Sequence, residues 1–473
     1  MPSNRPNQAL ASALAELGWS PRTLARRINR TFGTGTVAES VPYHWRDSGG
    51  VPRPPLPTYV AWVLTQELGR PVTVAELWQG RAADSPVTLP ADVEVDRAWS
   101  QAGTLGLLDD WITAGLLDRR VFLGVSGSAL RSIAAGYLSA ESGALTAALE
   151  GDRVSAPLLE QIEQSIPHLQ RLDDAAGGGA HLNYVGAQFR AVALLLRQGS
   201  HSPGVEHRLY TALAEIGQLA GWMAFDGGKP GLAQRYFFTA LKAAHAANYR
   251  AMAAHVLADL AFQAATVENP GDAVELGEMA DHAAHSTPSG VRASVRTRLA
   301  YAYAVAVRLD SFDRAYRSAI DVLGSDGGGE NPAWMYYLTP NHLDTQAGYA
   351  LVHAGTLASD DRNQSAAAPL LRRGERLLRD GAHAVSPDHP SQRRALFEGA
   401  WLTVATTYQG NHEKAWQFGQ VALTRTQNVH SVRSLSVLSR LGSRLRRAQR
   451  NEYARSLSAM LDRALPRVAG TKR

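Results

Sequence analysis

Apolar residues recur at intervals of three and four positions along almost every long segment of the chain. This spacing gathers them on one face of an α-helix, whereas a half-buried strand would alternate apolar and polar residues, and no convincing run of that kind occurs. Two such sets are Leu10, Ala13, Leu14 and Leu17, and Leu257, Leu260, Ala261 and Ala264. The pattern predicts an all-α protein.

Segments rich in Pro, Gly, Asp and Ser interrupt this pattern and divide the chain. VPRPPLP (51–57) is a stiff loop, RAADSPVTLPADVEVD (81–96) is typical of a linker, and the breaks at 173–181, 326–332 and 385–392 are predicted to be exposed turns. The length of 473 residues is too great for one ordinary core. We predict a small domain over residues 1–80, a linker with connecting helices over 81–165 and a helical-repeat domain over 166–473.

From about residue 205 the predicted helices recur in pairs with a period near 40 residues. Small residues return at matching places, where they let the two helices of a pair cross closely. The clearest units are GWMAFDGGKPGLAQRYFFTAL (221–241) and GNHEKAWQFGQVAL (410–423). The recurrence resembles tetratricopeptide repeats, some of them degenerate, which implies a right-handed superhelix with a concave inner surface.

Four short helices are predicted in the first 80 residues. The first covers residues 7–17, the second opens with Ser20 as N-cap and Pro21 at its first position, and the fourth begins at Pro57. The residues that the second helix turns toward the core are Leu24, Ala25 and Ile28.

The start of the third helix has two interpretations. If Ser40 is the N-cap, Pro42 falls in the first turn, where proline is tolerated, and Trp45 faces the core. A start at Thr36, with Glu39 completing a capping box, would leave Pro42 inside the helix. The later start is preferred.

These residues carry a resemblance to a known family. LARRIN, YHWRDSGGVPRPP and LGRPVTVAELW resemble the helix-turn-helix of actinobacterial, Streptomyces-type regulators related to the phage-repressor class. LDDAAGGG (172–179), LAGWMAFDGG (219–228), WMYYLTPNHL (334–343) and VHSVRSLSVLSRL (429–441) are similar to the helical-repeat half of the same family. The resemblance implies that the helix carrying Trp45 enters the major groove, and that the protein controls morphological differentiation or antibiotic production. The overall plan is also similar to that of Gram-positive peptide-pheromone receptors.

One departure concerns the connection RTFGTGTVAE, which makes the spacing from Leu24 and Ala25 to Trp45 longer than in a plain phage repressor. The docking geometry therefore stays open.

Candidate DNA contacts lie on the second and third helices and the loop that follows. Outward side chains of the third helix could reach base edges, and the arginines around it could bind phosphates. The set is Arg22, Arg26, Arg27, Ser40, Tyr43, His44, Arg46 and Arg53. Residues 1–80 hold eight arginines against five acidic residues, a modest excess for binding double-stranded DNA, so a homodimer that doubles the contacts is expected.

Candidate ligand contacts lie in the repeat half. Asparagine amides can donate to and accept from peptide groups, so a row of them beside aromatic residues along a concave surface would suit an extended peptide. The set is Asn183, Trp222, Asp226, Asn248, Tyr301, Trp334, Tyr337 and Asn341. The alternative for Trp222 and Tyr301 is packing between repeats, and for the asparagines a role as helix caps.

Composition and motifs argue against catalysis and cofactors. The absence of cysteine excludes disulfides, thiolate chemistry and sulfur-ligated zinc. No phosphate-binding loop, nucleophile elbow or zinc-protease helix is present; GVSGSAL (124–130) lacks the second glycine of an elbow, and His282 with His285 alone make a weak metal signal. No segment reaches the roughly 18 apolar residues of a membrane helix, so a cytoplasmic protein that is not an enzyme, with no metal and no cofactor, is expected.

We therefore expect a dimeric transcriptional regulator that reads DNA with its N-terminal helix-turn-helix and senses a peptide, small-molecule or protein ligand in the repeat groove. The alternative is a protein-interaction scaffold with a vestigial DNA-binding head, which captures another regulator in the groove. The operator, the ligand and the sign of regulation are left open.

Overall fold

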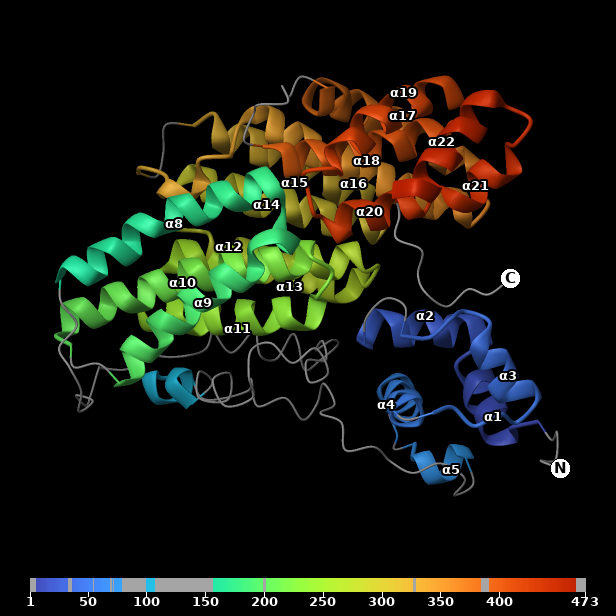
Figure 1. The fold of residues 1–473 in the computed structure, drawn as a ribbon, viewed down its shortest axis with the longest axis horizontal. Coiled ribbons are helices and arrows are strands. Elements are labelled where there is room, and N and C mark those ends of the chain that lie inside the picture. Colours follow the sequence, from blue (N-terminus) through green and yellow to red (C-terminus); the bar gives the residue numbers. More distant parts are fainter. Residues whose placement is uncertain are drawn as a thin grey trace.

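The structure, a computed structural model, describes residues 6–32, 36–53, 55–68, 70, 72–78, 99–106, 156–198, 201–325, 329–383 and 391–464 (Figure 1). All regular elements in these ranges are helices, and no strand occurs among them. The prediction of an all-α protein is confirmed. None of the helices in the same ranges is both long and apolar enough to cross a membrane.

The N-terminal part folds around a core of its own. Its helices are α1 (Gln8–Glu16), α2 (Pro21–Phe32), α3 (Val41–Asp47), α4 (Leu56–Leu68) and α5 (Val74–Trp78). Asn7 caps α1 by accepting from Leu10 N at 3.0 Å, and its side-chain amide donates to Leu77 O at 2.9 Å, which ties α1 to α5. Buried Trp45 and Trp78 meet edge to face with ring centroids 6.2 Å apart.

The helix starts follow the local signals in the sequence. Helix α2 begins at Pro21, and Ser20 Oγ accepts from Thr23 N at 3.2 Å. Helix α3 begins at Val41 with a proline in its first turn, so the later of the two starts is the observed one, although Ser40 makes no side-chain cap bond. Helix α5 was not predicted as a separate element.

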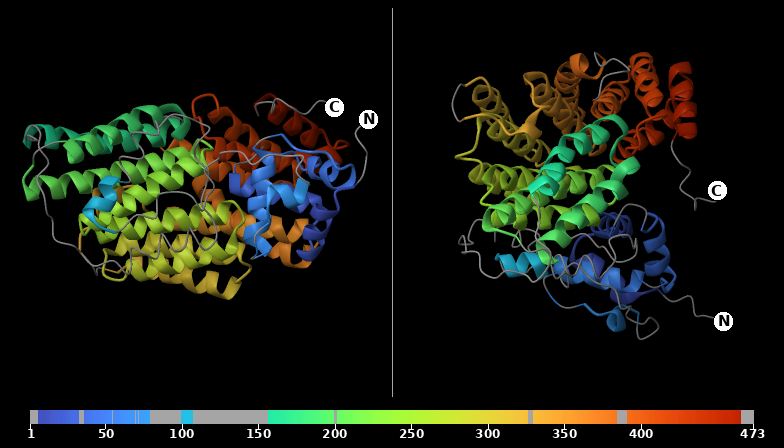
Figure 2. Two further views of the ribbon diagram at one scale, coloured as in Figure 1. Left: turned by 90° about the horizontal axis from the view of Figure 1, so that it is seen from below. Right: turned by 60° about the vertical axis from the view of Figure 1, so that its left-hand side comes forward.

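From residue 203 onward the helices form consecutive pairs. The pairs are α10 (Pro203–Asp226) with α11 (Pro230–Ala246), α12 (Arg250–Thr266) with α13 (Pro270–Ala283), α14 (Ser289–Val305) with α15 (Leu309–Leu323), α16 (Pro340–Asp360) with α17 (Gln364–His383), and α18 (Gln392–Tyr408) with α19 (His412–Arg425). First helices of neighbouring pairs pack on one another and form an inner layer, and the second helices lie outside them (Figure 2). The pairs begin at residues 203, 250, 289, 340 and 392, so the interval varies from 39 to 52 residues.

The turn inside each pair has the same backbone form. The second residue after the first helix has a left-handed φ, at Gly228, Glu268, Val307, Arg362 and Gly410. In each turn the next amide donates to the carbonyl five residues back, with bonds of 2.8 to 3.0 Å. This hydrogen-bond pattern ends a helix in a tight left-handed turn, a conformation that suits glycine best.

Val307 has the least suitable side chain for this conformation, because it is β-branched, has φ 60° and is 72% exposed. We expect Val307→Gly to raise the free energy of unfolding by about 1 kcal/mol, since it relieves a left-handed strain of about 1–2 kcal/mol at a smaller entropic cost. Urea denaturation measures the change. Gly410→Ala, at the equivalent position of a turn with open space around an added Cβ, should lower the free energy of unfolding by a similar amount. A lower free energy of unfolding for Val307→Gly would contradict the argument.

The end of the array returns to its beginning. Helices α8 (Ala156–Ala176) and α9 (Gly178–Gln198) precede the pairs, and α20 (Val432–Ser439), α21 (Gly442–Arg447) and α22 (Glu452–Ala464) follow them. His430 N donates to Ala176 O at 2.7 Å, and Gly179 N donates to His430 O at 3.1 Å. Helix α8 packs on α18, and α20 packs on α10, so the inner layer is closed into a ring.

This closure corrects one prediction. Residues 173–181 are not an exposed turn, because α8 continues to Ala176, α9 begins at Gly178, and Asp173 and Asp174 are buried. Of the predicted linker and connecting region, residues 99–106 lie against the array, where the Trp99 ring has the Lys242 ammonium 4.3 Å from its centroid. The GVSGSAL segment (124–130) lies outside the described residues.

Candidate functional site

A cavity of about 110 Å³ lies inside the closed array. It is lined by residues of α8, α10, α12, α14, α16 and α18, by the aromatic segment 334–337, and by Arg433 of α20. A single water requires roughly 10–15 Å³ of such space, so the cavity can hold a small organic molecule.

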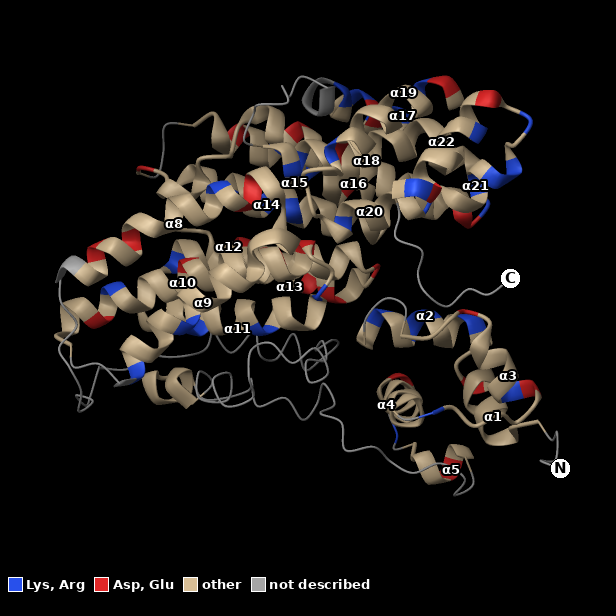
Figure 3. Cartoon of the chain, viewed as in Figure 1, with Lys and Arg blue, Asp and Glu red and all other residues tan. Residues whose placement is uncertain are grey.

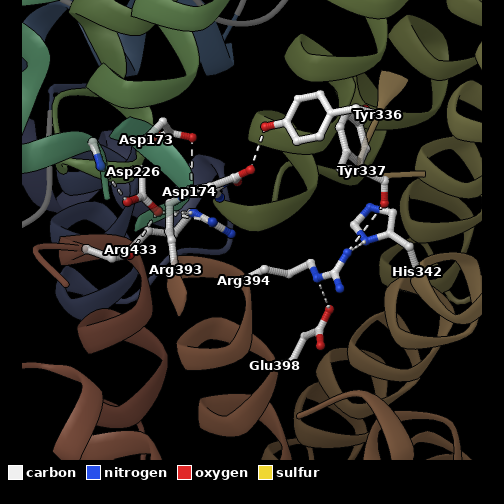
Figure 4. A network of polar contacts seen from close by, with 12 residues as sticks. Asp173, Asp174, Asp226, Tyr336, Tyr337, His342, Arg393, Arg394, Glu398 and Arg433 are labelled. Atoms are coloured by element: carbon white, nitrogen blue, oxygen red, sulfur yellow. Dashed lines mark hydrogen bonds and ion pairs between the residues drawn. The ribbon is translucent and has the colours of Figure 1, made fainter. Parts of the chain in front are cut away.

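One end of the cavity is formed by a buried ion-pair cluster where the array closes (Figure 4). Asp226, at the end of α10, is fully buried and accepts from Arg433 Nη2 at 3.0 Å and from Ser431 Oγ at 2.8 Å. Its second oxygen accepts from Gly178 N at 3.1 Å. Asp226 therefore joins the first pair, the start of α9 and the C-terminal segment through one carboxylate.

Asp173 and Asp174 of α8 share the guanidinium of Arg393 on α18. Arg393 Nε lies 3.0 Å from Asp173 and Nη2 lies 3.1 Å from Asp174, which also accepts from the hydroxyl of Tyr336 at 2.5 Å. Burial, together with the nearby carboxylates of Asp226 and Asp174, raises the pKa of Asp173 to about 7 against the pull of Arg393. Burial of so many charges at one end is tolerated because each guanidinium has a carboxylate partner.

Two further ion pairs lie along the cavity. Arg298 of α14 pairs with Asp259 of α12, which also accepts from Gln218 Nε2 at 2.7 Å. Arg394 Nε lies 3.5 Å from Glu398, which accepts from the hydroxyl of Thr345 on α16 at 2.8 Å. Burial raises the pKa of both Asp259 and Glu398 from the ordinary value of each.

Two histidines of the cavity wall, buried His255 and half-buried His342, are neutral, since desolvation and nearby arginines lower the pKa of each well below the ordinary value. Arg394 Nη1 lies 3.2 Å from Nδ1 of His342 and can only donate, so Nδ1 accepts and Nε2 carries the hydrogen. Gln346 Nε2 lies 2.6 Å from that Nε2, and its Oε1 is buried without a partner. Two N–H groups cannot hydrogen-bond to each other, so we assign the amide the reverse orientation, in which its oxygen accepts from His342 and its NH₂ takes the unpartnered position.

The same reasoning applies to His255. The NH₂ of Gln218 donates to Asp259 and lies 3.3 Å from His255 Nε2, which therefore accepts. The hydrogen of His255 is on Nδ1, which has no partner. Oδ1 of Asp173 is also buried without a partner.

Aromatic side chains form the walls between these polar groups. The ring of Trp222 has the guanidinium carbons of Arg298, Arg393 and Arg433 at 5.4, 5.6 and 5.1 Å from its centroid. Trp334 stacks at a tilt on His255 with centroids 4.7 Å apart and donates to the hydroxyl of Tyr249 at 2.8 Å. Cations over an indole ring are attracted to its face, so Trp222 helps to hold the three guanidiniums together.

The structure brings together only some of the predicted ligand contacts. Trp222, Trp334 and Tyr337 line the cavity, and Asp226 lies directly behind it. Tyr301 is buried among aromatic rings with its hydroxyl 2.7 Å from Nδ1 of His353. The predicted residues that lie on exposed positions away from the lining are Asn183, Asn248 and Asn341.

Asn248 occupies a left-handed turn, with φ 47°, between α11 and α12. This is the capping role that the sequence offered as the alternative for the asparagines.

Sequence reasoning missed the charged lining. Asp173 and Asp174 stood in a segment taken for an exposed turn, and the arginines were not connected to them. Adjacent Arg393 and Arg394, with Glu398 one turn later, in the largely apolar helix 392–408 were the available signal, because a long, mostly apolar helix in an inner layer buries most of its length.

The predicted DNA contacts in the N-terminal part are exposed, except Arg27 and Arg46, which are half-buried. Figure 3 marks basic positions on α2 and α3 in blue. In α3, Pro42 and Trp45 are buried while Tyr43 and His44 are exposed, and Arg46 pairs with Asp47 at 2.6 Å. The loop before α3 is fixed by Asn29, whose side chain exchanges two 2.8 Å hydrogen bonds with the backbone of Val37.

The remaining predicted contacts surround α3. Arg22 and Arg26 pair with Glu39 at 3.1 and 3.0 Å, and Arg27 pairs with Glu67 at 3.3 Å. Ser40 and Arg53 are exposed.

Comparison with known families bears on this part of the chain alone. Residues 10–78 match the SP15 N-terminal domain. The match covers nearly all of α1 to α5 and none of the repeat half. No curated protein matches the chain.

Within the described residues, no group of three or more histidine or acidic side chains has an arrangement that could hold a metal ion.

Proposed function

We propose that the protein is a transcriptional regulator that binds double-stranded DNA through α2 and α3 and senses a ligand in the closed helical array. The observation that carries the proposal is the division of α3 into two faces. Pro42 and Trp45 anchor it to the core, Tyr43 and His44 are exposed on the opposite side, and Arg46 is half-buried at the edge between the two faces. A short helix held rigidly behind its neighbour, with a polar outer face, is the element that a helix-turn-helix protein inserts into the major groove.

The closed array supports the sensing half of the proposal. Its cavity is lined by paired charges and aromatic rings, and among its buried polar groups Asp173 Oδ1, His255 Nδ1 and one end of the Gln346 amide make no hydrogen bond. Buried polar groups in folded proteins are ordinarily hydrogen-bonded, so a ligand would complete this set. The proposed assembly is a homodimer, whose two α3 helices would double the phosphate and base contacts of one head.

A second candidate function, a scaffold with a vestigial head, is favoured by the ion pairs around α3. Glu39 pairs with Arg22 and Arg26, and Asp47 pairs with Arg46, which reduces the positive charge offered to phosphates. DNA binding requires that these guanidiniums exchange an exposed carboxylate for a phosphate, a small cost because exposed pairs contribute about 0–1 kcal/mol.

Selection of binding sites from random duplex DNA with the full chain separates the two functions. We expect an enriched sequence, and binding to it at least about tenfold weaker for His44→Ala with Arg46→Ala, since base contacts contribute about 1–3 kcal/mol each. His285→Ala with Arg314→Ala is the matched control, because it removes the same two side chains from exposed positions on the array. No enrichment, or equal affinities of the two double variants, would favour the scaffold.

A further inference from the structure

We propose that the cavity takes a small, uncharged, planar molecule carrying an amide-like pair of a hydrogen-bond donor and an acceptor. The donor of the ligand would donate to Asp173. The acceptor of the ligand would accept hydrogen bonds from the NH₂ of Gln346 and from Nδ1 of His255. This proposal rests on the ligand-sensing half of the proposed function and names the chemistry that the site selects.

Four arginines in one cavity suggest an anion site at first, yet every one of them already has a carboxylate. Arg433 pairs with Asp226, Arg393 with Asp173 and Asp174, Arg298 with Asp259, and Arg394 with Glu398. These four guanidiniums already face five carboxylates, so an anionic ligand would add a buried negative charge with no cation left to balance it, which is strongly unfavourable. A cationic ligand would meet the guanidiniums gathered around Trp222. The fixed charges therefore select against a net charge of either sign.

The groups without partners are of the kind that a neutral ligand satisfies. Oδ1 of ionised Asp173 accepts, Nδ1 of neutral His255 donates, and the amide of Gln346 donates in the orientation assigned above. All three side chains line the cavity and belong to residues no more than 5% exposed. A buried polar group without a hydrogen-bond partner costs about 1–3 kcal/mol. A ligand that hydrogen-bonds to all three groups therefore gains most of its affinity and its orientation from these bonds.

The walls and the size restrict the shape of the ligand. Trp222, Trp334, Tyr337 and Phe397 present ring faces or edges to the cavity, which favours a flat apolar body. A volume of about 110 Å³ corresponds to about ten non-hydrogen atoms, too few for an extended peptide.

Three ring compounds of the same shape test the proposal: neutral benzamide, anionic benzoate and cationic benzamidine. Ligand-observed NMR with the full chain should give benzamide a Kd of about 1 mM or below and a binding at least about tenfold tighter than that of either charged compound. Tighter benzoate would show an anion site, tighter benzamidine a cation site, and no binding of any of them at about 10 mM would remove the proposed ligand class.

Two variants connect the binding to the site. Asp173→Leu removes the acceptor while Arg393 keeps Asp174, and Gln346→Leu removes the amide; each should weaken benzamide at least about tenfold. Asn183→Ala, on an exposed position of α9, is the control, and circular dichroism verifies the fold of each protein. Unchanged benzamide binding in both leucine variants would overturn the proposal. DNA binding is measured separately, so failure here is distinguishable from failure of the DNA-binding head.

Discussion

Replacement of Arg433 by alanine is expected to lower the free energy of unfolding of the helical array by about 3–5 kcal/mol. Arg433 and Asp226 are both buried, and their ion pair joins α20 to the end of α10. Without the guanidinium, Asp226 keeps its bonds from Ser431 and Gly178 but remains a buried charge with no cation at 3.0 Å. The ring would be weakened at its closure, where the remaining links are the Ser431 bond, the backbone bonds of His430 and the packing of α8 on α18.

Urea denaturation of the full chain measures this loss, and Arg446→Ala, at an exposed position of α21, is the matched control. The double variant Asp226→Asn with Arg433→Met should regain much of the stability, since a buried pair replaced on both sides leaves no uncompensated charge. A loss below about 1 kcal/mol for Arg433→Ala would show that the pair is solvated in solution and that the closure does not depend on it.

Gly178→Ala is the second change with a large expected effect, and it should lower the free energy of unfolding by about 3 kcal/mol. A Cβ at Gly178 would lie 2.1 Å from the carbonyl oxygen of Met223 and 2.6 Å from its Cα. Both obstacles are backbone atoms of α10, so no side chain can rotate away to make room. The start of α9 would have to move, and Gly178 N would lose its 3.1 Å bond to Asp226.

Gly204→Ala provides the control for this substitution. Gly204 lies in the first turn of α10 with open space around the position of a Cβ, so alanine there should stabilise the protein by up to about 1 kcal/mol. Equal effects of the two alanine variants would mean that α9 and α10 do not approach as closely as the structure describes.

Closure and cavity depend on the same residues. Asp173, Asp174 and Asp226 come from the beginning of the array, and Arg393 and Arg433 come from its end. The cavity therefore has its shape only while the two ends are joined. In the proposed regulator, this makes the ion-pair cluster the place where a bound molecule and the arrangement of the helices affect each other.

The local structure could be predicted because short-range signals determine it. Pro21 sets the start of α2, and Pro42 decides between two starts of α3, because proline is tolerated in a first turn and not in a helix interior. The helical pairs followed from small residues such as Gly221, where an added Cβ would lie 2.6 Å from the ring of Phe237. Each of these signals involves neighbouring residues or two adjacent helices.

The candidate site could not be predicted because it is assembled from distant residues. Asp226 and Arg433 are 207 positions apart, and Asp174 and Arg393 are 219 apart. No periodicity relates such pairs, and a buried arginine has the same letter in the sequence as an exposed one. The tryptophans were predicted because large aromatic residues are common in binding grooves, whereas the exposed asparagines lie in a turn (Asn248) or on the outer side of a helix (Asn183 and Asn341), which the sequence did not distinguish from the inner side.

The central claim is that the N-terminal helices read DNA, and genome-wide binding of the tagged protein in its own host tests it most directly. We expect discrete peaks that share an inverted repeat, as a dimer would require, and their loss in the His44→Ala with Arg46→Ala protein at equal abundance. Absence of enrichment in the wild-type protein, with the double variant indistinguishable from it, would contradict DNA reading and assign the array to the capture of another protein.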